Sequence, residues 1–198
     1  VPMTTWHTAR DGLAETAQWL GLVTMSLGKM AFDVSLMMAN EFSEVFEPFV
    51  QGRGASSAMP QKRNPDVAEL ARGKSRRVIG HLMGLLTLMK GQPLTYNKDN
   101  QEDKEPLFDT VDTVRDTLRI MAEMVGGIQV KAAAMEAAAL RGYATATDLA
   151  DYLVKKGLPF RDAHEAVAKA VRAAEVRSCD LSDFTLAELQ AFSPLIGE

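Results

Sequence analysis

The sequence predicts an all-α protein, in which a bundle of long helices is followed by a small helical domain. Three long stretches have no proline in their interior and place apolar residues three and four positions apart, which is the spacing of one helix face. Eleven Met, with many Ala and Leu, accompany only three Tyr and two Trp, a composition that favours helices. No stretch of strand length alternates between apolar and polar residues.

The first predicted helix spans residues 5–42. The apolar residues of its main face lie at helical spacing: Leu13, Ala17, Leu20, Val23, Leu27, Met30, Val34 and Met37. Other apolar residues, such as Leu22 and Phe32, fall outside this face, so we expect the helix to be buried on several sides. Pro48 and the glycines after it end the regular structure and open a loop at residues 52–65.

Asn64-Pro65 is expected to start the second long helix, because Asn is a good N-cap and Pro fits the first helical turn. This helix runs to about residue 90, and a polar segment at 96–105 separates it from a third helix at 106–125. Three long helices with so much apolar surface cannot cover one another fully. The sequence therefore predicts assembly through helix–helix contacts.

Gly126-Gly127 marks the predicted domain boundary, because the helices become shorter beyond it. Residues 1–127 are expected to form the bundle domain, and residues 128–198 a small C-terminal helical domain. Its helices are predicted at residues 132–140, 147–156, 161–176 and 185–192. Neither end of the chain looks like a natural protein terminus, so we expect a piece of a longer protein.

Composition argues against several classes of function. A net charge of −4 argues against nucleic-acid binding, which needs clustered basic residues. The longest apolar runs are too short for a membrane span. Cys179 is the only cysteine, which fits a reducing compartment and predicts a cytoplasmic location. We expect no metal and no cofactor, because the sequence has no histidine pair at ligand spacing and no phosphate-binding glycine motif.

The loop and the start of the next helix, residues 52–69, carry the residues suited to chemistry. Ser56 and Ser57 lie among small residues that let backbone N–H groups approach a ligand. Lys62 adds a positive charge, and Asn64 stands at a helix N-terminus, which attracts anions. A serine whose oxygen was held by such groups would lose its proton more readily. The alternative is a flexible polar loop that ends in an ordinary Asn-Pro cap.

Residues 54–65, Gly-Ala-Ser-Ser-Ala-Met-Pro-Gln-Lys-Arg-Asn-Pro, resemble the signature Gly-Ser-Ser-x-Met-Pro-x-Lys-x-Asn-Pro of the fumarase/aspartase superfamily. Ala55 departs from it, since the superfamily usually has Gly there and Ala disfavours positive φ. The resemblance implies that Ser56 removes a proton from Cβ of a succinyl group. It further implies that Lys62 and Asn64 bind the neighbouring carboxylate and stabilise the resulting carbanion.

The same resemblance assigns roles to three neighbouring residues. Glu69 would orient a histidine from another part of the active site, and Ser57 and Met59 would contribute to substrate binding.

Beyond the loop the resemblance narrows to argininosuccinate lyase, over about residues 55–198. The runs that carry it are residues 64–70, 81–90, 96–99, 101–109 and 146–153. It implies that Tyr96, Gln101 and Lys104 bind the substrate, with Lys104 suited to a carboxylate. Residues 1–54 look more like 3-carboxy-cis,cis-muconate cycloisomerase of the same superfamily. The chain could therefore be a natural intermediate between the two enzymes or a hybrid of two relatives.

The function expected from these resemblances is cleavage of argininosuccinate to arginine and fumarate by β-elimination. Alternatives are carboxymuconate lactonization and a non-catalytic helical assembly. His7 is expected to cap or pack, His81 to be structural and His164 to lie on the surface. The resemblance implies that the general-acid histidine comes from an earlier segment. It also implies that residues 1–127 are the C-terminal part of a central bundle, and that sites form between subunits of a homotetramer.

Overall fold

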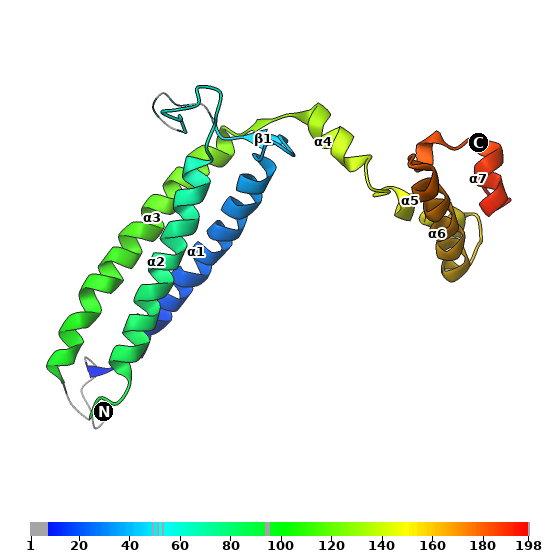
Figure 1. The fold of residues 1–198 in the computed structure, drawn as a ribbon. Coiled ribbons are helices and arrows are strands. Elements are labelled where there is room, and N and C mark those ends of the chain that lie inside the picture. Colours follow the sequence, from blue (N-terminus) through cyan, green and yellow to red (C-terminus); the bar gives the residue numbers. More distant parts are fainter. Residues whose placement is uncertain (1–7, 49, 51, 53, 94–95, 198) are drawn as a thin grey trace. The chain divides into compact units, whose positions relative to one another are not determined.

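The computed structural model describes residues 8–48, 50, 52, 54–93 and 96–197, and the chain divides into two compact units, Val1–Lys131 and Ala132–Glu198 (Figure 1). The predicted all-α class is confirmed. Within the described residues the regular structure is helical apart from one short pair of strands. Gly126-Gly127, where the sequence predicts the boundary, lies at the C-terminal end of the third long helix.

The first unit is a bundle of three long helices, α1 (Asp11–Met37), α2 (Asp66–Met89) and α3 (Lys104–Gly126), as Figure 1 shows. Small residues let α1 and α2 approach closely: Ala31 and Ala68 are fully buried against Met124 of α3. The helix predicted at 5–42 ends earlier than expected. Ser43, with φ at 51°, turns the chain back after Met37.

A short antiparallel pair joins β1 (Val45–Phe46) to β2 (Gln129–Val130), with Val45 opposite Val130. Two residues are too few to produce an alternating pattern, which explains why the sequence does not predict these strands. The pair fixes the segment before the loop to the segment that follows α3.

The second unit contains α4 (Ala132–Ala139), α5 (Ala146–Lys155), α6 (Phe160–Arg177) and α7 (Leu186–Phe192), close to the predicted ranges. Its core forms where α5 and α6 pack together around the buried residues Leu153, Ala163 and Val167. Ser178 in the left-handed conformation ends α6, and a capping box formed by Thr185 and Glu188 starts α7.

Helix α1 requires a correction to the expectation that no segment could span a membrane. An 18-residue window in α1 has a mean hydropathy of 1.3, with 28% of the window buried, so the helix is long and apolar enough by composition alone. Core helices of globular proteins pass the same test. In this structure α1 packs along α2 and α3 through Leu20 and Ala31.

Candidate active site

The loop that carries the paired serines, residues 54–65, is called the serine loop below. Its base is closed by Gly54, whose N–H donates to Asp66 Oδ2 at 2.6 Å and whose carbonyl accepts from Asn64 N–H at 2.9 Å. Ala55 and Arg63 form an antiparallel bridge next to this closure. Gly54 has φ at 71°, and a Cβ there would lie 2.9 Å from the Asn64 carbonyl oxygen. Gly54, and not Ala55, therefore occupies the position that requires glycine.

Ser56 lies inside the turn that follows. Its Oγ accepts hydrogen bonds from the N–H groups of Met59, at 3.0 Å, and Ala58, at 3.3 Å. Two donors aimed at one hydroxyl oxygen favour its deprotonated form, which a serine base needs. Ser57 and Met59 are exposed, so both are accessible to a ligand from solvent.

Lys62, Arg63 and Asn64 line a cavity of about 190 Å³ under the serine loop, together with Glu47. Lys62 is exposed and Asn64 is half-buried. The Arg63 guanidinium lies 5.6 Å from the centre of the Phe46 ring, which holds it against β1. The predicted carboxylate-binding pair, Lys62 and Asn64, thus shares one small cavity with a second cation that the sequence did not single out.

The N-terminus of α2 differs from the prediction. Its N-cap is Pro65, which makes no side-chain cap, so the expectation that Asn64 caps this helix is wrong. Glu47 takes that place: its Oε1 accepts from Ala68 N–H at 2.9 Å and its Oε2 from Val67 N–H at 3.2 Å. The helix terminus expected to attract a substrate anion already binds a carboxylate of its own chain. This contact bridges some twenty residues, so local spacing gave no signal for it.

The segment between the end of α2 and the start of α3, which lies at the other end of the bundle (Figure 1), carries Tyr96, Gln101 and Lys104. The serine loop precedes the first residue of α2, and these three follow its last residue, so about 36 Å of helix separates the two groups, at 1.5 Å per residue over 24 residues. A single chain therefore does not bring the two sets of predicted site residues together.

Lys104 begins α3 directly after a 3₁₀ helix, η2 (Lys98–Asp103). Its ammonium group lies 2.9 Å from Asp103 Oδ1 and donates to the Asn100 carbonyl at 3.0 Å. Asp103 is almost fully buried and also pairs with Arg10, the N-cap residue of α1, at 2.5 Å. The ammonium group of Lys104 is thus paired with a buried carboxylate, while Tyr96 and Gln101 are exposed.

The remaining predicted residues take separate positions. Glu69 is exposed on the first turn of α2. His81 Nε2 lies 2.7 Å from Asp109 Oδ2, which also accepts from Arg77, so His81 joins an ion-pair network between α2 and α3. His164 lies in the second unit, with its ring 6.2 Å from that of Phe160. His7 lies outside the described residues.

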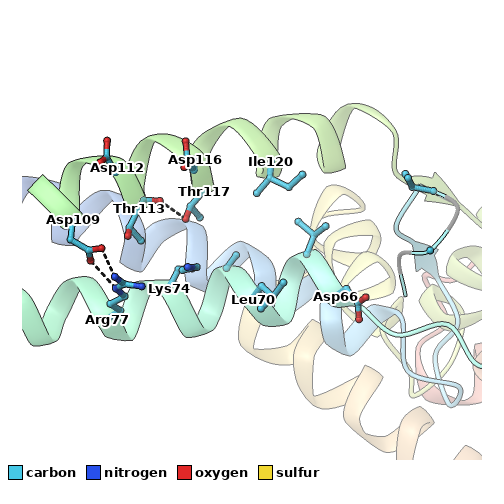
Figure 2. Close-up of a pocket in the computed structure, with 14 residues that line it drawn as sticks. Asp66, Leu70, Lys74, Arg77, Asp109, Asp112, Thr113, Asp116, Thr117 and Ile120 are labelled. Atoms are coloured by element: carbon cyan, nitrogen blue, oxygen red, sulfur yellow. Dashed lines mark hydrogen bonds and ion pairs between the residues drawn. The ribbon is translucent and has the colours of Figure 1, made fainter. Parts of the chain in front are cut away.

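A larger groove of about 750 Å³ runs between α2 and α3 and holds none of the predicted site residues (Figure 2). Arg77 of α2 pairs with Asp109 of α3 across it, while Asp112 and Asp116 pair with Arg115 of their own helix. Burial by itself raises the pKa of Asp109, but hydrogen bonds and charges from His81 and Arg77 outweigh this effect and hold the pKa below its usual value. Among the described residues, no three His, Cys, Asp or Glu side chains form a cluster that could hold a metal.

Two family models match the sequence. The model described as "Argininosuccinate lyase C-terminal" matches residues 143–198, and the model described as "Lyase" matches residues 2–80. The first of these ranges falls in the second unit of the structure, and the other falls in the first unit.

Curated relatives extend these matches over nearly the whole chain. The argininosuccinate lyase of Variovorax paradoxus (strain S110) is 63% identical over 189 residues, covering 94% of this chain and 40% of the relative. That of Janthinobacterium sp. (strain Marseille) is 64% identical over 189 residues, with the same coverage. The chain thus spans about 40% of the length of these relatives. A match to 94% of the chain necessarily includes most of residues 1–54. One argininosuccinate lyase therefore matches both parts of the chain, and a hybrid of two relatives is not needed to explain the sequence.

Solved structures agree on the fold. The 3-carboxy-cis,cis-muconate lactonizing enzyme of Pseudomonas putida has a TM-score of 0.76 and 33% identity, covering 97% of this chain and 46% of the enzyme. EDDS lyase in complex with formate has a TM-score of 0.82 and 28% identity, covering 94% of this chain and 37% of the other. The likeness of residues 1–54 to a muconate enzyme therefore coexists with a closer match to argininosuccinate lyases.

Proposed function

Because this chain belongs to the argininosuccinate lyase family of the fumarase/aspartase superfamily, we propose that it takes part in cleaving argininosuccinate to arginine and fumarate. The observation that carries this proposal is the serine loop: Ser56 accepts two backbone N–H bonds within it, and Lys62 and Asn64 of the same loop line one cavity. The remaining groups of the active site would come from the part of the relatives that this chain does not span.

The reaction is a β-elimination. Ser56, as an alkoxide, removes a proton from Cβ of the succinyl group, and the electron pair spreads into the neighbouring carboxylate. Lys62 and Asn64 bind this carboxylate and stabilise the charge that develops on it, which lowers the barrier because the interaction is stronger in the transition state. The C–N bond then breaks and fumarate forms. The departing nitrogen takes a proton from an acid that is not among the predicted site residues of this chain.

The substrate's other end needs Tyr96, Gln101 and Lys104, which lie one α2 length away from the serine loop of the same chain. We propose that they serve the serine loop of another subunit in a homotetramer. Support comes from the apolar side chains that the bundle exposes. They include Trp19, Leu22, Phe32, Leu70, Met83 and Phe108. Apolar surface of this extent on three packed helices marks an interface.

Glu69 positions a histidine from another segment, and Ser57 and Met59 contact the substrate from the exposed side of the loop. The substrate is a small dicarboxylate, with no nucleic acid or membrane as partner. The reaction takes place in the cytoplasm as part of arginine biosynthesis, and it needs no cofactor or metal.

The test follows fumarate by its ultraviolet absorbance after argininosuccinate is added to the assembled protein, with the rest of the relatives' length supplied on the same chain or by a companion subunit. Ser56→Ala is expected to lower kcat by at least about 100-fold, the usual contribution of a positioned base. Ser182→Ala, an exposed serine in the second unit, is the control and should have no effect. An undiminished rate in Ser56→Ala would contradict the proposal.

Carboxymuconate lactonization is the second candidate, favoured by the 33% identity to the Pseudomonas putida lactonizing enzyme over 97% of this chain. Turnover of carboxymuconate without turnover of argininosuccinate in the same assembly would select it. A stable tetramer that turns over neither substrate would select the non-catalytic assembly.

A further inference from the structure

Helix α2 lacks a capping residue from its own sequence. Its N-cap, Pro65, has no side-chain donor or acceptor, and Asp66 directs its carboxylate away from the helix, to Gly54 N–H. Free N–H groups at a helix N-terminus need a partner, and an Asn directly before the helix is among the best partners available. Here Pro65 takes the N-cap position, and Asn64, one residue earlier, does not cap the helix.

The partner is Glu47. Both of its carboxylate oxygens accept from α2, one from Ala68 N–H at 2.9 Å and one from Val67 N–H at 3.2 Å, and the residue is only 8% exposed. It is held between β1, which pairs with β2, and Pro48, which contacts Gly127 so closely that a Cβ there would lie 2.9 Å from the proline ring. Glu47 is therefore fixed from both sides and carries a negative charge at the positive end of α2.

This arrangement changes what Asn64 can do. Asn64 uses its backbone N–H to close the serine loop on Gly54, while its side-chain amide has no hydrogen-bond partner within the part of the chain that the structure describes. If Asn64 capped α2, its side chain would accept from the N–H of Asp66 or Val67, the usual donors for an N-cap. Glu47 already occupies Val67 N–H.

We propose that Glu47 is a positioning residue for this active site, because it caps α2 in place of Asn64 and so leaves the Asn64 amide available to the substrate carboxylate. The same contact keeps the substrate carboxylate off the helix N-terminus and directs it to Lys62 and Asn64 in the cavity under the loop. The inference rests on the proposed function of Asn64, and its first consequence can be measured without any turnover.

The first test uses NMR on this chain. In Glu47→Ala, we expect the amides of Val67 and Ala68 to exchange at least about tenfold faster, the loss of one charge-assisted hydrogen bond, and the side-chain NH₂ resonances of Asn64 to shift. Glu41→Gln removes the same charge from an exposed site nearby and should change neither. Unchanged Asn64 resonances in Glu47→Ala would overturn the proposal.

A second variant guards against misfolding. Glu47→Gln keeps one acceptor oxygen, so it should preserve the helix, release one of the two N–H groups and shift Asn64 part of the way. If Glu47→Ala does not fold, the result with Glu47→Gln decides: Asn64 resonances that remain at their wild-type positions while Val67 or Ala68 exchanges faster would overturn the proposal.

The second test is a double-mutant cycle in the assembled enzyme, with KM and kcat measured separately. Asn64→Ala is expected to raise KM about tenfold in the wild-type background, the cost of a hydrogen bond to a charged group, and less than about twofold in the Glu47→Ala background. Equal losses in both backgrounds would show a merely structural Glu47. If the wild-type assembly releases no fumarate, the proposed function fails, and the NMR result still decides the role of Glu47.

Discussion

The carboxylate of Asp66 accepts a hydrogen bond from the backbone N–H of Gly54 at 2.6 Å and so closes the serine loop across its base. The Gly54 carbonyl accepts from Asn64 N–H in the same closure. Ser56 and Lys62 are therefore carried on a loop whose two ends are fixed to the start of α2. The geometry of the predicted base depends on this closure as much as on the serine itself.

Gly54→Ala is expected to destabilise this closure by about 1–3 kcal/mol, the cost of a strained backbone conformation. The added Cβ would lie 2.9 Å from the Asn64 carbonyl, at a φ of 71° that L-residues rarely adopt. Gly52→Ala is the matched control, since its φ is 81° and a Cβ there meets nothing within 4 Å. Urea unfolding should show the larger loss for Gly54→Ala, and equal losses would contradict a role for the close contact.

Leu70→Glu is expected to weaken assembly of the chain. Leu70 is 66% exposed on α2 and lines the groove between α2 and α3, where a buried charge without a partner would oppose association. Val176→Glu changes an apolar residue that is 87% exposed in the second unit and serves as the control. Light scattering should report a lower mass for Leu70→Glu alone. Wild-type mass in that variant would exclude this groove from the interface.

Asp109→Asn is expected to lower stability near neutral pH, by an amount that shrinks as the pH falls below 3.8. The pKa of Asp109 is held below its usual 3.8, despite the opposing effect of burial, by His81 and Arg77. A carboxylate with a lowered folded-state pKa stabilises the fold above its unfolded pKa, and this contribution is lost as the pH falls through the lower value. Urea unfolding at a series of pH values from 7 downward measures the difference, and a deficit that does not shrink below pH 3.8 would contradict the assignment.

Glu188→Gln is expected to weaken the start of α7. The backbone N–H of Thr185, then Arg177 and the Thr185 hydroxyl, lower the pKa of Glu188 from 4.5 to about 2. Its contribution is therefore complete above about pH 4.5 and is lost as the pH falls toward 2. NMR of α7 during heating should show a lower midpoint for the variant at pH 7 and no difference near pH 2. Glu136→Gln, on the exposed face of α4, should match wild type throughout.

The sequence predicted the helices well because each signal is local. The apolar spacing in α1, α2 and α3, and the Thr185 start of α7, lie within one or two turns of the structure they specify. The serine loop was found for a similar reason, since its residues are contiguous.

Contacts between distant segments were not predictable in this way. Glu47 caps a helix that begins some twenty residues later, and Val45 pairs with Val130, although both α2 and α3 lie between them in the sequence. Asn64 was assigned as a cap because the local rule is sound, and a tertiary contact overrode it. The separation of Ser56 from Lys104 follows from the length of α2, which the sequence did predict, yet only the structure shows the two at opposite ends.

The central claim is that Ser56 of one subunit acts with Lys104 of another. The direct measurement mixes Ser56→Ala subunits with Lys104→Ala subunits, each inactive by itself, and follows fumarate release. Random mixing of equal amounts in a symmetric oligomer should restore about a quarter of wild-type activity, because about one site in four then receives both intact residues. No recovery in mixed oligomers of confirmed composition would contradict the claim.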